Sequence, residues 1–374
     1  MLSPAEMRFS GFVLGISLLL TLSACGGRSP STQHAGEGLD SPGALAGLLP
    51  AGAEVVALLE PSALRSAGPT RDMVDSIAGP GFLDSIRIRT GVDVMALHEL
   101  VVGVYGDDLL LIARGPQSAN DVVTVLGMRM SHTLSSSDEP ARRVGFLNGD
   151  LWHAIAFGER VFAIAIGDGE QLPAVHERVR LGHWPEGESG VVGGSEVRRV
   201  SERIVRGPAR VLLPQPLDLP QDSPLGLVLA QERVMGLSLV PVASDRVGVE
   251  IGIVGELPER AERNLRQWIT SMAGADLGRA LGLEAGLDSL RVQANAEDAW
   301  IRVDLPSTDL CRGLRILFGA ELREITEGLI HDVVPDGVAP NAPRERAPLF
   351  EGIGRGSRAQ EEAAPMTAGS ADDE

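Results

Sequence analysis

The chain has 374 residues, of which 44% are hydrophobic and 22% charged, and this composition is typical of a globular protein with a sizeable core. Its formal net charge is -18, which argues against binding to nucleic acid and against electrostatic attraction to anionic lipid. The absence of lysine excludes a Schiff-base lysine, a P-loop lysine and a lysine general base, and an aromatic content of 3% argues against stacking platforms for sugars or bases.

The amino terminus has the pattern of a signal peptide. Residues 9–22 form an apolar run that is too short to span a bilayer but typical of the apolar core of a signal peptide. Arg8 supplies the positive flank, whereas Glu6 is unusual in that position. The start of translation, at Met1 or at Met7, therefore stays open.

The apolar run ends in Leu22-Ser23-Ala24-Cys25, and this ending resembles the lipobox of bacterial lipoprotein precursors. The resemblance covers the first 25 residues. It implies that the signal peptidase recognises Leu22, Ser23 and Ala24, and that Cys25 becomes the lipidated first residue of the mature chain, anchored in the membrane by two or more acyl chains. A glycine at position 26, instead of an aspartate, resembles lipoproteins destined for the outer membrane. The alternative is an ordinary secretory signal peptide with a cysteine there by chance.

Composition predicts five segments along the chain. Residues 1–24 are the signal peptide, and residues 25–50 are a Gly-, Ser- and Pro-containing flexible tether. Residues 51–207 and 208–331 are the two halves of an α+β body. Residues 332–374 are a disordered acidic tail, for which a solvated tail is favoured over a partner-binding arm.

The body is predicted to begin with a strand at 54–59, followed by a helical stretch broken at Gly68-Pro69 and Gly79-Pro80. Four units then follow, each with two apolar runs joined by a tight turn and then an amphipathic helix; the second unit is preceded by a further run at 144–147. The predicted strands and helices are 100–105, 109–113 and 117–128; 151–157, 161–166 and 170–180; 234–240, 247–254 and 258–272; and 289–294, 300–305 and 308–318.

The third unit shows the alternation best. Val247, Val249 and Ile251 alternate with glycine and glutamate, which predicts a strand with one buried face, and Pro258 predicts the first turn of a helix. We therefore expect an α+β fold of antiparallel sheets with helices packed on one face, built from repeated β-β-α units in two similar halves. The boundary is expected at 182–194 or in the proline-rich stretch 214–224.

With a Thr-Gly-Val-Asp segment at 90–93 before the first hairpin, the body resembles uncharacterised envelope lipoproteins that repeat a hairpin–helix unit. This resemblance implies no known activity.

Histidine and acidic patterns do not predict a metal or cofactor site. His98-Glu99 begins like the zinc-protease motif, but Val102 stands where the second histidine is required. His176 and His183 are separated by a glycine that interrupts the helix between them. Asp107-Asp108 falls in a predicted hairpin turn, and a calcium role there would need several more oxygen ligands. The seven histidines are His34, His98, His132, His153, His176, His183 and His331.

Nucleophile patterns are equally weak. Ser189 and Ser195 lie in a glycine-rich stretch with no triad partners that the sequence identifies. Cys311 lies on the apolar side of a predicted helix, which favours a buried and inert thiol. If Cys25 carries lipid, Cys311 has no disulfide partner in the chain.

Three functions are compatible with these patterns. The favoured hypothesis is a lipid-anchored lipoprotein of the bacterial cell envelope, without catalytic groups or cofactors, whose body binds or scaffolds an envelope protein partner. A carrier of a lipid or a small apolar ligand would need an apolar cavity between the sheet and its helices. An enzyme would need a pocket lined by converging carboxylates or histidines.

Overall fold

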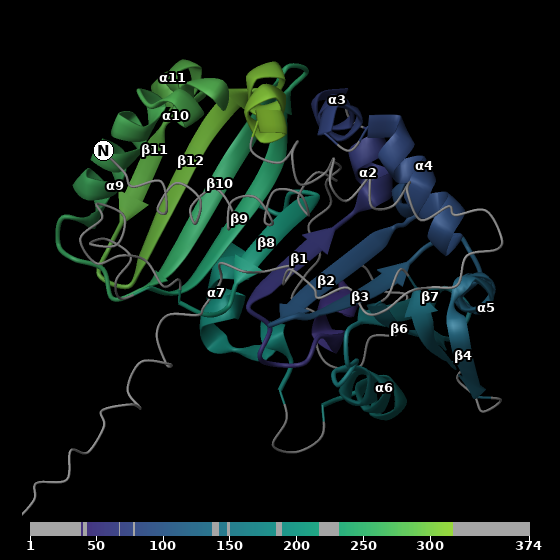
Figure 1. Cartoon of the computed structure of the whole chain (residues 1–374). Helices are drawn as coiled ribbons and strands as arrows, with labels where there is room; N and C mark the ends of the chain where they lie inside the picture. Colours follow the sequence, from purple (N-terminus) through teal and green to yellow (C-terminus); the bar gives the residue numbers. More distant parts are fainter. Residues whose placement is uncertain are drawn as a thin grey trace, which may run out of the picture.

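The computed structural model describes residue 39 and residues 43–66, 68–77, 79–136, 142–147, 150–184, 189–216 and 232–316 (Figure 1). Its strands form one twelve-stranded sheet in the order β11-β12-β10-β9-β8-β1-β2-β3-β7-β6-β5-β4, and every neighbouring pair is antiparallel. The strands are β1 (Val55–Leu59), β2 (Glu99–Tyr105), β3 (Asp108–Arg114), β4 (Ser131–Ser136), β5 (Arg142–Leu147), β6 (Asp150–Phe157), β7 (Val161–Ile166), β8 (Ala209–Leu213), β9 (Glu232–Ala243), β10 (Arg246–Gly255), β11 (Arg291–Ala294) and β12 (Asp298–Pro306).

Helices precede, separate and follow these strands. They are η1 (Ala44–Leu48), α2 (Pro61–Ser66), α3 (Gly68–Ile77), α4 (Gly79–Thr90), η2 (Val94–Ala96), α5 (Ala119–Arg129), α6 (Leu172–Leu181), η3 (Val191–Gly193), α7 (Ser195–Arg203), α9 (Ala261–Ala273), α10 (Asp276–Ala280), α11 (Leu283–Gly286) and η4 (Leu287–Ser289). Residues 307–316 are also helical.

The strand order divides the sheet into two halves with the same plan. β1 and β8 pair at the centre, and each begins a three-stranded meander: β1-β2-β3 in the first half and β8-β9-β10 in the second. Helices follow each meander, and a hairpin then returns so that β7 pairs with β3 and β12 pairs with β10. The first half adds β4 and β5 at its outer edge. The predicted α+β class, with an antiparallel sheet and two similar halves, is therefore confirmed.

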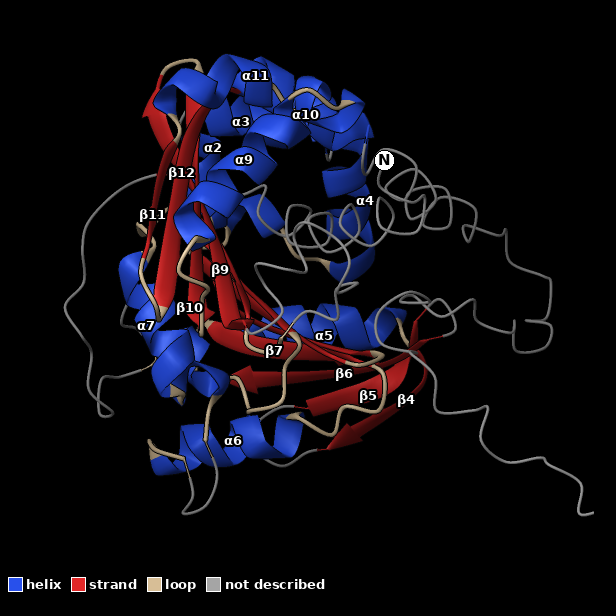
Figure 2. Cartoon of the chain, turned by 90° about the vertical axis from the view of Figure 1, so that its left-hand side faces the viewer, coloured by secondary structure: helices blue, strands red, loops and turns tan. Residues whose placement is uncertain are grey.

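Helices cover both faces of the sheet at its centre. One face packs against α2, α3, α5, α10, α11 and residues 307–316, with α9 over the outer strands, and the opposite face packs against η1, η3, α6 and α7. Figure 2 shows α5 and α6 on opposite sides of β6 and β7. The expectation of helices on one face holds only at the outer edge of the second half, where Trp300, Arg302 and Asp304 of β12 point away from α9 and are half-exposed. β1 is buried along its whole length.

The predicted boundaries agree closely with the structure where hydrophobic periodicity is strong, as in β2, β3, β6, β7, β10 and β12. One local prediction is wrong: Pro258 precedes the helix, because α9 begins at Ala261. Sequence reasoning also missed α7, where it expected only a glycine-rich stretch around Ser195, and the short strands β4 and β8.

Of the predicted tether 25–50, residues 25–38 and 40–42 lie outside the described residues. For residues 43–50 the prediction is wrong, because they contain η1 and bury Leu45, Leu48 and Leu49 against the sheet. The predicted acidic tail also lies outside the described residues.

Candidate functional site

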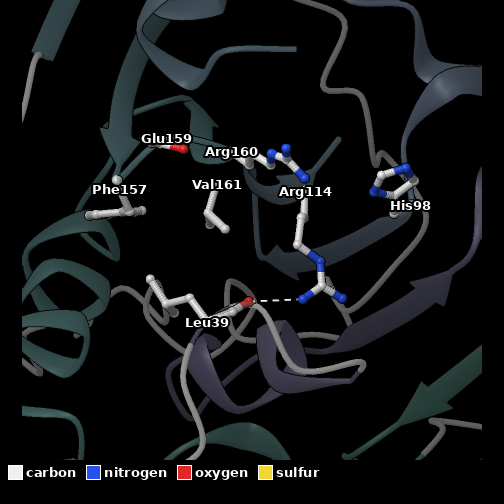
Figure 3. Close-up of a pocket in the computed structure, with 8 residues that line it drawn as sticks. Leu39, His98, Arg114, Phe157, Glu159, Arg160 and Val161 are labelled. Carbon is white, nitrogen blue, oxygen red and sulfur yellow. Dashed lines mark hydrogen bonds between the residues drawn. The ribbon is translucent and has the colours of Figure 1, made fainter. Parts of the chain in front are cut away.

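A pocket of about 530 Å³ lies in the first half, where β3 ends and the turn between β6 and β7 begins (Figure 3). Its size is within the range of small-molecule sites in proteins. It lies at the ends of strands rather than between the sheet and a helix layer. The residues that line it are Leu39, His98, Arg114, Phe157, Gly158, Glu159, Arg160 and Val161.

Backbone hydrogen bonds position the charged walls of this pocket. The amide of Gly115, just after β3, donates to the carbonyl of Arg160 (3.3 Å), and the amide of Ala119 donates to the carbonyl of Glu159 (2.7 Å). The amide of His98 donates to the carbonyl of Arg114 (2.8 Å). The turn, the end of β3 and the start of β2 are therefore held together by main-chain contacts.

Apolar side chains form the rest of the wall. Phe157 and Val161 are buried, and the ring of Phe157 stacks on that of His176 in α6, with 6.3 Å between ring centroids. Leu39 is half-buried and packs against the same apolar cluster as these two side chains. The pocket thus offers an apolar wall beside cationic side chains.

A buried ion pair lies beneath the pocket. Arg114 donates to the carboxylate of Glu99 at 2.7 Å, and the two side chains are only 10% and 9% exposed. Burial raises the pKa of Glu99, while Arg114 and the amide of Gly43 oppose this rise. The pair also binds the chain that leads into β1, because Arg114 donates to the carbonyl of Leu39 (2.9 Å) and Gly43 donates to Glu99 (3.2 Å).

His98, Glu159 and Arg160 are the exposed charged or titratable side chains of the lining. Among the described residues, no carboxylate lies within ion-pair distance of Arg160. Figure 3 draws His98 and Arg160 on the two sides of Arg114. This arrangement can donate hydrogen bonds to an anionic group at the pocket mouth.

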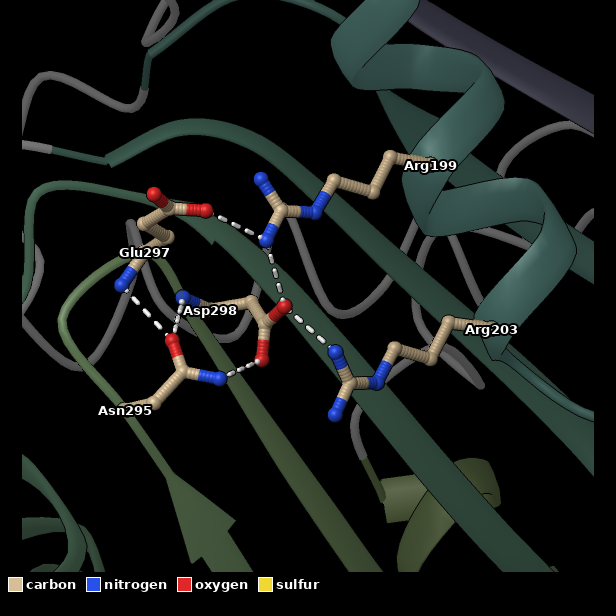
Figure 4. Close-up of polar contacts among 5 residues, drawn as sticks. All are labelled: Arg199, Arg203, Asn295, Glu297 and Asp298. Carbon is tan, nitrogen blue, oxygen red and sulfur yellow. Dashed lines mark hydrogen bonds and ion pairs between the residues drawn. The ribbon is translucent and has the colours of Figure 1, made fainter.

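A second polar cluster lies in the other half, where α7 meets the start of β12 (Figure 4). Asp298 is 3% exposed and accepts hydrogen bonds from Arg203 and from Arg199, the latter at 2.9 Å. Arg199 also pairs with Glu297 at 2.8 Å. Asn295 completes the cluster, because its side-chain amide donates to Asp298 at 2.8 Å and its oxygen accepts from the backbone amides of Glu297 and Asp298.

The residues that the sequence singled out are not brought together. Leu22, Ser23, Ala24 and Cys25 lie outside the described residues. Cys311 is buried on the helix 307–316, as expected, and burial raises the pKa of its thiol to about 11.

Asp108 interacts electrostatically with His153, but in the described part of the chain the histidines and the paired aspartates are not gathered into one site. His98 lines the pocket, whereas His183 is exposed after α6. His153 is buried on β6, and Asp108 accepts a hydrogen bond from the amide of Asp168 (3.0 Å). Within the described ranges, no three His, Cys, Asp or Glu side chains are grouped so that they could hold a metal ion.

Sequence reasoning missed Arg114 and Arg160 altogether. Both lie at the ends of strands whose pairing was not known from the sequence, and each alone reads as an ordinary surface arginine. The sequence did offer one signal. In a strongly acidic chain with 51 acidic residues, Arg160 stands in a short turn directly before the buried strand β7.

Comparisons with known proteins give no identity for the chain. No protein-family model and no curated protein matches it. Among solved structures, crystal forms III and IV of TP0453 are similar, with TM-scores of 0.43 and 0.44, identities of 9% and 10%, coverage of 71% of this chain, and coverage of 95% and 94% of the other chains. At these values the likeness has no bearing on function. No helix in the described part of the chain is long and apolar enough to cross a bilayer.

Proposed function

We propose that this chain is a lipid-anchored lipoprotein of the bacterial cell envelope whose α+β body binds a partner or ligand without catalysing a reaction. The observation that carries the anchor is the sequence Leu22-Ser23-Ala24-Cys25 at the end of an apolar run. The thiol of Cys25 would receive a diacylglycerol through a thioether, and cleavage before Cys25 would then free its amine for acylation. Several acyl chains give stable attachment to a membrane.

The way the chain enters the body supports a tethered arrangement. Leu39 and Gly43 are hydrogen-bonded to the buried pair of Arg114 and Glu99, so the last part of the predicted tether docks on the body instead of hanging free. Residues 25–38 then remain as the connection to the membrane. The pocket lies beside the point where the tether joins the body, which favours a binding role for this part of the surface.

Metabolic labelling tests the anchor. The full-length chain is expressed in a bacterium fed an alkyne fatty acid, and the amino-terminal peptide is examined by mass spectrometry. We expect label on Cys25, loss of label and release from membranes in the Cys25→Ala variant, and unchanged labelling in the matched Cys311→Ala variant. A Cys25→Ala protein that stays fully membrane-bound would contradict the anchor.

Fractionation tests the proposed outer-membrane destination. In an enterobacterial host, the wild-type chain should appear in outer-membrane fractions, and the Gly26→Asp variant should move toward the inner membrane. Equal distribution of the two proteins would count against this destination. Crosslinking in intact envelopes, followed by purification of the chain, should then identify a specific protein partner.

A further inference from the structure

The pocket lies in the first half of the sheet, and the second half has a structurally corresponding position. In the first half Gly115 donates to the carbonyl of Arg160 (3.3 Å), and in the second half Gly255 donates to the carbonyl of Glu297 (3.0 Å). Gly115 directly follows β3, and Gly255 is the last residue of β10. Each bond therefore joins the end of the third meander strand to the turn of the hairpin that pairs with it. The register agrees, because Arg114 pairs with Val161 and Val254 pairs with Asp298. Arg160 and Glu297 therefore occupy corresponding positions.

In the second half, the charged residues at this position form ion pairs within the protein. Its turn is acidic, and the guanidinium groups of Arg199 and Arg203 from α7 bind the carboxylates of Glu297 and Asp298 (Figure 4). Asp298 is almost fully buried by this contact. An acidic turn and a basic helix thus neutralise each other within the protein.

The first half has the opposite charge at the same place. Arg160 replaces Glu297, Val161 replaces Asp298 and Arg114 replaces Val254. The short helix η1 precedes β1 where α7 precedes β8, and it contains no charged residue. In the described part of the chain no carboxylate pairs with Arg160, and an open pocket lies in front of it.

We propose that this pocket binds a small molecule with one anionic group, a phosphate or carboxylate, next to a short apolar segment. Arg160 and His98 bind the anionic group, which takes the place of the pairing that the second half makes internally. The buried charge of Arg114 adds attraction, although Glu99 neutralises much of it. The apolar segment lies against Leu39, Phe157 and Val161. The concave shape strengthens the local field in an otherwise acidic protein.

Glu159 is the acidic side chain on the lining, and it provides an internal check. Its charge opposes an anionic ligand, so neutralising it should strengthen binding. Arg263, exposed on α9 in the other half, provides a matched control for loss of one arginine.

Calorimetry on the mature chain carrying Cys25→Ala tests the assignment with four probes: inorganic phosphate, hexyl phosphate, hexanoate and hexanol. We expect hexyl phosphate and hexanoate to bind, each more tightly than inorganic phosphate, and hexanol not to bind. Arg160→Gln should weaken hexyl phosphate about tenfold or more, Glu159→Gln should strengthen it, and Arg263→Gln should leave it unchanged.

Two results would overturn the inference. One is no binding of either amphiphile at millimolar concentration by a chain that unfolds cooperatively. The other is equal affinity in the Arg160→Gln and Arg263→Gln variants. The inference rests on the binding role proposed above but not on the anchor. If Cys25 carries lipid and crosslinking identifies a protein partner while these probes fail, only the ligand assignment is lost.

Discussion

The segments that lead into the two central strands are both bound by polar side chains of the sheet, but by different residues. We define the first leading segment as Leu39 with residues 43–54, and the second as residues 195–208; they precede β1 and β8. Both lie on the same face of the sheet. In the first half the segment is bound by Glu99 of β2 and Arg114 of β3.

The second leading segment is bound by the corresponding two strands. Ser238 of β9 donates to the carbonyl of Val205 (2.6 Å), and Glu250 of β10 accepts from its amide (2.8 Å). Glu250 is fully buried and pairs with Arg302 of β12 at 3.0 Å. In both halves a buried acid binds the leading segment, but the two acids are not at corresponding positions: Glu99 lies on the second strand of its meander and Glu250 on the third. In the second half α7 then fills the surface next to Glu250, and in the first half a pocket remains.

The largest effect is expected from Glu250→Ala. It leaves the amide of Val205 without its acceptor and a cavity in place of a fully buried side chain, while Arg302 keeps its contact with Asp304 at 3.3 Å. Urea unfolding should show a loss of about 4 kcal/mol from the unpaired amide and the cavity together. Glu284→Ala, at an exposed site on α11, should stay within about 0.5 kcal/mol of wild type. A similar small change for both variants would contradict the role given to Glu250.

The second prediction concerns the buried ion pair of the first half. Arg114→Met leaves Glu99 buried without its partner and should cost about 3 kcal/mol. Adding Glu99→Gln removes the unpaired charge, so the double variant should be more stable than Arg114→Met alone. If the losses of the two single variants simply add, the pair is not coupled and the comparison between the halves fails.

A smaller effect is expected where α7 meets β12. Asp298→Asn keeps the shape of the side chain but removes the charge that binds Arg199 and Arg203, and it should cost about 2 kcal/mol. Asp276→Asn, whose side chain is fully exposed, should cost far less although it too removes an arginine contact. Double-mutant cycles between Asp298 and each arginine measure the two contributions separately.

The smallest effect is a pH dependence from His153. Burial lowers the pKa of His153, and Arg142 lowers it further, while Asp108 and Asp168 oppose the shift. The unfolded chain therefore takes up a proton first as the pH falls below about 6.5, so stability should decrease there and not at higher pH. His153→Gln should reduce this slope, measured as unfolding free energy against pH, and His183→Gln should leave it unchanged. An unaltered slope in His153→Gln would show that other groups cause it.

Local patterns predicted the strands well, and physical reasons explain the misses. Alternation at Val247, Val249 and Ile251 identified β10, but the prediction of a single buried face was wrong. Glu250 on the other face is fully buried, whereas Val249 and Ile251 are only half-buried, because helices cover both faces of the sheet there. α7 carries mostly charged residues and buries only Val197 and Val200, so its apolar stripe is too narrow to be seen in the sequence. β8 is short and owes its burial to its place in the middle of the sheet.

The pocket could not be predicted because it depends on pairing between distant strands. Arg114 and Arg160 come together only through the contact of β3 with β7. The equivalence of Arg160 with Glu297 likewise appears only from the hydrogen bonds of the two hairpin turns. The proposed lipid anchor, in contrast, rests on consecutive residues around Cys25 and can be proposed without any tertiary structure.

The most direct test changes Arg160 in the first half to the acidic residue found at the corresponding position in the second half. In Arg160→Glu the residue matches the acidic Glu297 at the corresponding position. Calorimetry with hexyl phosphate should show binding to the wild-type chain and none to this variant at the same concentration, with unchanged urea unfolding in both. Binding of hexyl phosphate to Arg160→Glu with wild-type affinity would contradict the account.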